Sequence, residues 1–213
     1  MTTWHALIAA AALCPFAGCA THDHNATPPR PGSGLEEYRQ LTGEATAGVL
    51  SALSWLERVS AQPGRCPPKI VSGFAHEVEQ LQVKSIRVRA RGQAIRARGD
   101  AYFEAWTGGG EQLSVVPPRP TPERLAQLRE NFTKIKLASQ EAGETFRPFF
   151  NGLRNLRAEL EADPGVIENE KARELIRTTR ERGLQVLQKL GALEDELHAM
   201  RPLMTQQKPV TKH

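Results

Sequence analysis

From residue 35 onward, apolar residues recur at alternating steps of three and four, which is the spacing of one face of an α-helix. Ser33 and Glu36 have the spacing of a capping box, so the first helix is predicted to begin near Gly34. Three prolines between residues 62 and 68 end it, because proline cannot continue a helix. The apolar positions of this first helix are Leu35, Tyr38, Ala45, Val49, Ala52, Leu56 and Val59.

A second helix is predicted from about Lys69 to Trp106. Large and small residues alternate along its apolar seam, which comprises Phe74, Val78, Leu81, Ser85, Val88, Gly92, Ile95, Gly99, Tyr102 and Trp106. The small residues would let the backbone of a partner helix come close, although each glycine weakens the helix by roughly 1 kcal/mol. A Gly- and Pro-rich loop follows, from Thr107 to Pro120.

The third helix is predicted to begin with Thr121 as N-cap and Pro122 as its first residue. Pro148 lies inside this helix and is expected to kink it. The sequence Asp163-Pro164-Gly165 ends the helix and offers a new N-cap. The seam of this third helix comprises Leu125, Leu128, Phe132, Ile135, Ser139, Ala142, Phe146, Phe149, Leu153, Leu156 and Leu160.

The fourth helix is predicted to end at Pro202, and residues 202–213 are predicted to form a disordered tail. Its seam comprises Ala172, Ile176, Thr179, Gly183, Val186, Leu190, Leu193, Leu197 and Met200. Because only a short break separates the third and fourth helices, they should be antiparallel neighbours. The pattern predicts an all-α fold over residues 35–201: an elongated antiparallel helical bundle, packed like a coiled coil, of three long helices and a shorter N-terminal one.

The N-terminal segment has a different pattern. Residues 4–18 are apolar and uncharged, too short to span a bilayer, and typical of the core of a secretory signal. The segment ends in Phe16-Ala17-Gly18-Cys19, which resembles the lipobox of bacterial lipoproteins, although leucine is commoner at the position of Phe16. The resemblance implies that residues 1–18 are a signal peptide and that Cys19 is acylated with chains such as palmitate. The alternatives are an ordinary cleaved signal, a retained anchor, or a disordered start without a targeting role.

The residue after Cys19 is Ala20 rather than Asp, so the resemblance favours the periplasmic face of the outer membrane in a Gram-negative host. Residues 19–34 are rich in proline, glycine and polar residues, which is typical of a tether. His22-Asp23-His24 lies in this tether without distant partners, so no metal site is predicted there.

Two further motifs occur in the helical part. Residues 101–106 read AYFEAW and residues 146–154 read FRPFFNGLR, and a leucine-rich antiparallel helix follows. Together they resemble the bacterial domain-of-unknown-function 2959 family over about residues 36–200. This resemblance implies long helices, but it carries no established activity and names no catalytic residues. In this chain, Glu159 to Pro164 replaces the basic, asparagine-bearing segment that family members often show.

Composition and the absence of known motifs exclude several classes of function. The chain has 213 residues, enough for one domain, and a formal net charge of +4, which is too mild for nucleic-acid binding by charge alone. It contains no phosphate-binding Gly-rich motif, no His-Glu-x-x-His and no Cys-x-x-Cys. His76 and His198 each lie among charged residues on a helix. We therefore expect no enzyme, no cofactor, no metal and no nucleic-acid partner.

The most distinctive charged feature is a basic run without an intervening acid, from Lys84 to Arg98. At 100° per residue, one sector of the helix carries Lys84, Arg87, Arg91 and Arg98, and another carries Arg89 and Arg96. Three interpretations are open. The long side chains could cover the edges of the seam, pair with acids on the third or fourth helix, or bind an anion such as a lipid head group or cell-wall polymer.

Cys66 is the only thiol that remains if Cys14 is cleaved off and Cys19 is acylated. Outside the cytoplasm it could form a disulfide with a second copy of the chain, and the alternative is a free or buried thiol.

Taken together, the lipobox-like segment, the tether and the absence of catalytic motifs predict a lipid-anchored structural or interaction protein of the bacterial cell envelope. Its partners would be the membrane and an envelope protein or polymer, with a homo-oligomer as the alternative to a monomer. The alternative is an envelope binding module for an anionic ligand on the stripe of Lys84, Arg87, Arg91 and Arg98.

Overall fold

The computed structural model describes residues 34–107 and 120–205. The predicted signal peptide, Cys19 and nearly all of the tether lie outside these residues, as does the predicted tail after Thr205. Within the described residues the chain forms helices and turns, with no strand. The elements are α1 (Leu35–Ser60), α2 (Pro68–Thr107), α3 (Pro122–Ala162), the short 3₁₀ helix η1 (Val166–Glu168) and α4 (Glu170–Thr205).

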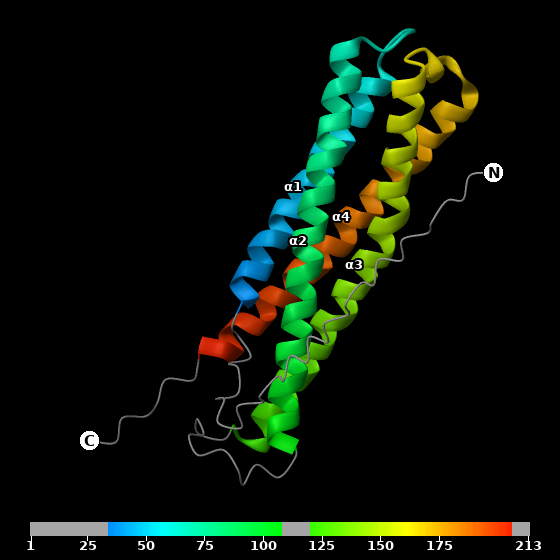
Figure 1. Cartoon of the computed structure of the whole chain (residues 1–213). Helices are drawn as coiled ribbons and strands as arrows, with labels where there is room; N and C mark the ends of the chain where they lie inside the picture. Colours follow the sequence, from blue (N-terminus) through cyan, green and yellow to red (C-terminus); the bar gives the residue numbers. More distant parts are fainter. Residues whose placement is uncertain (1–33, 108–119, 206–213) are drawn as a thin grey trace, which may run out of the picture.

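The four α-helices form an elongated antiparallel bundle (Figure 1). α1 packs between α2 and α4, and α3 packs between α2 and α4 on the opposite side. The α1–α2 and α3–α4 connections lie at the same end, the upper end in Figure 1, while α2 and α3 continue past the start of α1 at the lower end. The predicted fold is confirmed, and α1 is a full member of the bundle.

The predicted seams face the interior. Every seam position predicted for the first and fourth helices is buried in α1 and α4. In the other two helices, the exceptions lie mainly at one level of the rod, where Ser85 and Val88 of α2 and Ser139 and Phe146 of α3 are only half-buried. The period of the sequence therefore identifies the buried faces, and its exceptions mark a local defect in packing.

The buried side chains separate into two clusters along the rod. The upper core contains Phe74, Phe149 and Leu156 and includes residues of all four helices. The lower core contains an aromatic group, with the Phe103 and Phe132 ring centroids 5.5 Å apart. Of the buried residues of α1, only Leu35 and Tyr38 belong to the lower core.

The first helix begins at Leu35 with Gly34 as its N-cap (φ 90°), so the predicted start near Gly34 is confirmed. The Glu36 carboxylate binds Arg39, and Ser33, the other residue of the predicted capping box, lies outside the described residues. The predicted start of the fourth helix differs from the structure. The α4 helix begins after η1, where the Asn169 side chain accepts a hydrogen bond from the Lys171 amide at 2.9 Å. Asp163, the predicted cap, instead tightens the preceding turn by accepting from the Gly165 amide.

The start of α3 is confirmed. The Thr121 hydroxyl accepts a hydrogen bond from the Arg124 amide at 3.3 Å, and Pro122 is the first helical residue.

Neither Pro148 nor Pro202 ends its helix, and the kink expected at Pro148 stays a prediction. α3 is helical on both sides of Pro148, and α4 continues through Pro202 to Thr205, so the predicted end of the fourth helix is wrong. Proline removes only one helical hydrogen bond. The last turn of α4 is held from outside, because the Arg124 guanidinium donates a hydrogen bond to the Leu203 carbonyl.

Candidate functional site

The basic stripe of Lys84, Arg87, Arg91 and Arg98 lies on α2, and half of it is neutralised by α1. Arg87 Nη1 lies 3.2 Å from Glu44 Oε2, and Arg91 forms an ion pair with Glu37. Pairing with acids was one of the three interpretations, but the partner helix is α1 rather than the third or fourth helix. The reason is that α1 is the neighbour of α2 on this side of the bundle.

The other two residues of the stripe are also engaged in the bundle. The aliphatic part of Lys84 covers Gly48 of α1, so closely that a Cβ at Gly48 would lie 3.1 Å from Lys84 Cδ. Arg98 is half-buried and has an interaction partner. Lys84, Arg87 and Arg91 therefore join α2 to α1. Lys84 acts as the covering interpretation expects, whereas the two arginines pair with acids of a helix other than the two expected.

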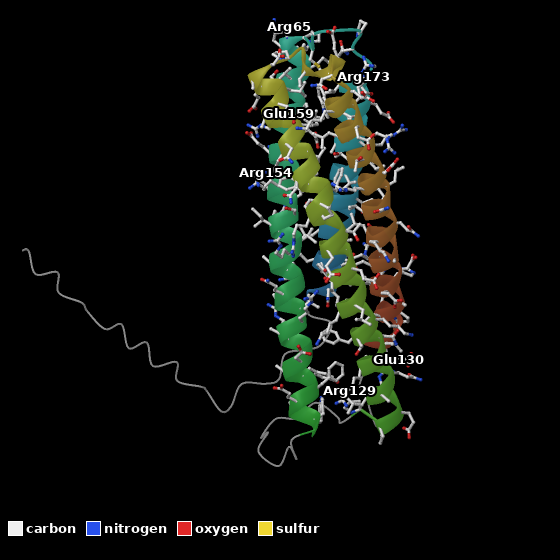
Figure 2. All side chains as sticks on the ribbon, turned by 90° about the vertical axis from the view of Figure 1, so that its right-hand side faces the viewer. Arg65, Arg129, Glu130, Arg154, Glu159 and Arg173 are labelled. Carbon is white, nitrogen blue, oxygen red and sulfur yellow. The ribbon has the colours of Figure 1, made fainter. Side chains whose placement is uncertain are left out.

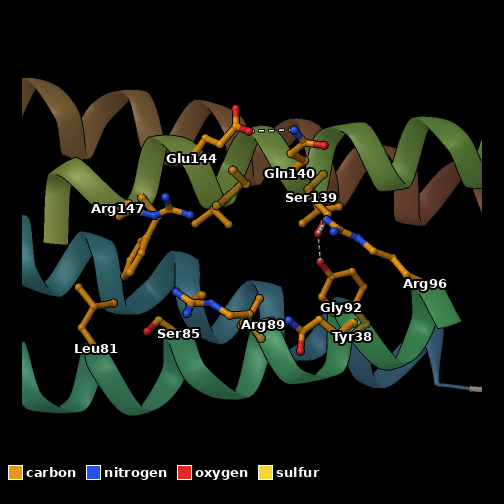
Figure 3. Close-up of a pocket in the computed structure, with 18 residues that line it drawn as sticks. Tyr38, Leu81, Ser85, Arg89, Gly92, Arg96, Ser139, Gln140, Glu144 and Arg147 are labelled. Carbon is orange, nitrogen blue, oxygen red and sulfur yellow. Dashed lines mark hydrogen bonds between the residues drawn. The ribbon is translucent and has the colours of Figure 1, made fainter.

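The other two basic residues of the run from Lys84 to Arg98, Arg89 and Arg96, line a groove between α2 and α3. The groove has a volume of about 280 Å³ and lies at the level where the seam residues are half-buried (Figure 3). Its cause is visible in the sequence, because Ser85 on α2 and Ser139 on α3 are too small to fill the space between the helices, whereas the Tyr38 side chain covers Gly92. The residues of its apolar interior include Ala45, Leu81, Val88, Ala142, Phe146, Leu190 and Leu193.

Three arginines surround the groove. Arg89 and Arg147 reach into it from α2 and α3, and Arg96 lies beside Ser139 and Tyr38 (Figure 3). Arg96 Nη2 donates to Ser139 Oγ at 3.2 Å, while its Nε is buried without a hydrogen-bond partner among the described residues.

Two further hydrogen bonds order the polar side chains of the groove. The Tyr38 hydroxyl and Ser139 Oγ are 2.7 Å apart, and burial raises the pKa of Tyr38, which favours the neutral phenol. Glu144 is the one acidic residue of the lining, and its Oε1 accepts a hydrogen bond from the Gln140 amide at 2.8 Å. With three arginines against one glutamate, the lining carries a net positive charge.

The sequence contained part of the signal for this groove. Ser85, Gly92 and Ser139 were assigned to the seams, and Arg89 and Arg96 to a separate sector of the helix. Arg147 was not singled out, because its place beside Arg89 depends on how α2 and α3 pack against each other. Small seam residues at matching levels of two neighbouring helices were the missed indication.

Cys66 is a free, buried thiol, with 1% of its surface exposed. Its amide donates a hydrogen bond to the Pro164 carbonyl at 2.8 Å, which joins the α1–α2 turn to the α3–α4 turn. Burial raises the pKa of the Cys66 thiol. This location matches the buried-thiol alternative, and a disulfide with a second chain would require the turn to open.

The remaining candidates do not converge on a site. His76 and His198 are exposed on α2 and α4, and no group of three potential metal ligands occurs in residues 34–107 and 120–205. No helix in these two ranges is both long enough and apolar enough to cross a bilayer.

Comparisons with models of protein families, with curated proteins and with solved structures give no match. The groove between α2 and α3 is therefore the main candidate site of the described bundle.

Proposed function

We propose that this chain is a lipid-anchored interaction protein of the bacterial cell envelope. The observation that carries the proposal is the lipobox-like sequence Phe16-Ala17-Gly18-Cys19, which follows an apolar, uncharged segment. The resemblance to the domain-of-unknown-function 2959 family agrees with long helices behind a signal peptide and leaves the molecular role open.

The length of chain between Cys19 and the first helix limits how far the bundle can lie from the membrane. α1 begins at Leu35, so 15 residues, 20–34, separate Cys19 from the first helix. Fully extended, such a tether spans about 50 Å. The 40 residues of α2 correspond to a rod of about 60 Å. An acylated Cys19 would thus hold the bundle close to the membrane while leaving it free to turn.

The surface of the rod suits an interaction role in water. Charged side chains, Glu130 and Arg154 among them, point outward along the bundle (Figure 2). We propose that an envelope protein or polymer is recognised on this surface, while two or more acyl chains on Cys19 provide stable attachment to the periplasmic face of the outer membrane.

The test is cell fractionation of the Cys19→Ala variant together with mass spectrometry of the mature N-terminus. We expect the parent chain in the membrane fraction, beginning at an acylated Cys19, and the variant released from it or left uncleaved. Cys14→Ala is the matched control, because it removes a cysteine of the same segment and should change neither result. A parent chain found soluble with Met1 intact would contradict the proposal.

The alternative, an anionic ligand on Lys84, Arg87, Arg91 and Arg98, has weaker support. Arg87 and Arg91 already have carboxylate partners in Glu44 and Glu37. An external anion would have to compete with these partners, so the stripe offers little free charge.

A further inference from the structure

We propose that the groove between α2 and α3 binds a single-chain amphiphile with an anionic head group, such as a fatty acid. This inference concerns a ligand site and does not depend on whether Cys19 is acylated. It rests on the apolar interior of the groove, on its size and on the arginines at its rim.

The interior of the groove suits an aliphatic chain. Leu81, Val88, Phe146, Leu190 and Leu193 line it, and none of these side chains can hydrogen-bond to a ligand. Each methylene group removed from water into such surroundings is stabilised by the hydrophobic effect. A volume of about 280 Å³ lies just below the range of typical ligand pockets, about 300 to 1,000 Å³. One acyl chain fits this size better than two.

The rim of the groove suits an acidic head group. Arg89 and Arg147 are exposed, come from facing helices, and have no hydrogen-bond or ion-pair partner among the described residues. A guanidinium group binds a carboxylate or phosphate through two parallel hydrogen bonds. The only carboxylate in the lining, that of Glu144, is held by Gln140. The two arginines are therefore available for an anion from outside.

Arg96 extends the positive charge along the groove. It is anchored to Ser139, which also binds the Tyr38 hydroxyl, so its charge is held in place without a carboxylate partner among the described residues.

Gly143 lies on the same stretch of α3, and a Cβ built there would meet no atom within 4 Å. A larger side chain at Gly143 can therefore occupy the groove without disturbing the helices.

The experiment is calorimetric titration of the full chain carrying Cys19→Ala, which keeps the protein free of its own acyl chains. The probes are dodecanoate and dodecyl phosphate, each below its micelle concentration, with dodecanol and inorganic phosphate as the apolar and anionic halves alone. We expect saturable binding of either anionic amphiphile, and at least tenfold weaker binding of dodecanol and of phosphate. The tighter of the two amphiphiles identifies the head group.

Two pairs of variants test the location. Gly143→Leu should weaken binding at least tenfold, whereas Gly191→Leu, at a helical glycine with equally open surroundings on α4, should leave it unchanged. The double variant Arg89→Gln, Arg147→Gln should weaken binding by tenfold or more, because hydrogen bonds to charged groups are lost. Arg154→Gln, an exposed arginine of α3 outside the groove, is its control. Circular dichroism verifies that each variant is folded.

The proposal is overturned if the folded parent binds neither amphiphile, or if dodecanol binds as tightly as dodecanoate. Equal effects of Gly143→Leu and Gly191→Leu would also overturn it, because binding would then lie elsewhere on the chain. Binding of inorganic phosphate with the affinity of dodecyl phosphate would exclude a role for the apolar interior.

Discussion

Glycine residues determine how closely side chains of one helix approach the backbone of another in this bundle. A Cβ at Gly99 would lie 2.0 Å from Phe132 Cζ, and one at Gly152 would lie 2.3 Å from Thr179 Oγ1. The sequence predicts that small seam residues admit a partner's backbone. Instead, Gly99 and Gly152 each admit a side chain of the neighbouring helix. The glycines are therefore part of the packing of individual side chains.

The contact between Gly99 and Phe132 gives a direct prediction. Gly99→Ala should lower the free energy of unfolding by about 1–3 kcal/mol, because the added methyl group overlaps a ring that also packs against Phe103. Urea denaturation measures the change. The matched control is Gly191→Ala, which has open surroundings and should gain up to about 1 kcal/mol from helix propensity. Equal shifts of the two variants to higher stability would contradict the packing argument.

At the scale of elements, the ends of the helices depend on individual polar side chains. α3 starts at Pro122 with Thr121 as its N-cap, as the sequence predicts, since the threonine and the following proline are a local signal. The start of α4 is displaced from Asp163 to Asn169 because η1 intervenes, with Ile167 buried in the upper core. Tertiary packing thus chooses between two residues that are equally suitable as caps.

The role of Asn169 can be tested by Asn169→Ala, which should lower the free energy of unfolding by about 1 kcal/mol through loss of the hydrogen bond to the Lys171 amide. Asn151→Ala, in an exposed position in the interior of α3, should be neutral or slightly stabilising, because alanine is the better helix former there. Thermal unfolding of both variants provides the comparison. If the two melt together, Asn169 does not cap the helix.

The sequence predicts the helices and their buried faces better than it predicts which helices lie side by side. Buried faces are visible because apolar residues repeat with the helical period, and this holds along the whole of α4. The period does not state which helices lie side by side. Glu37 and Glu44 of α1 therefore could not be identified as partners of Arg91 and Arg87. For the same reason, the groove and the contribution of Arg147 emerge only once α2 and α3 are placed together.

At the scale of the whole molecule, the two ends of the rod differ. The upper end holds both turns, joined by the hydrogen bond from the Cys66 amide to Pro164, with α1, α2, α3 and α4 all present. Toward the lower end, α2 and α3 extend past Leu35, the first residue of α1 (Figure 1). Apart from Tyr38, the aromatic residues of the lower core belong to α2 and α3. The groove lies between these two parts and contacts residues of both cores, such as Leu81 and Leu193.

Because the two cores meet at a level that the side chains fill poorly, they need not melt as one cooperative unit. Trp55 packs against the upper core and Trp106 is buried in the lower one, so each reports on one half. In a Trp4→Phe background, we expect the chain that retains only Trp106 to lose its fluorescence signal at a lower urea concentration than its helical circular dichroism. The chain that retains only Trp55 should lose its signal later. Coincident transitions would show a single unit. Separate ones would mean that the lower half can open while the upper half stays folded.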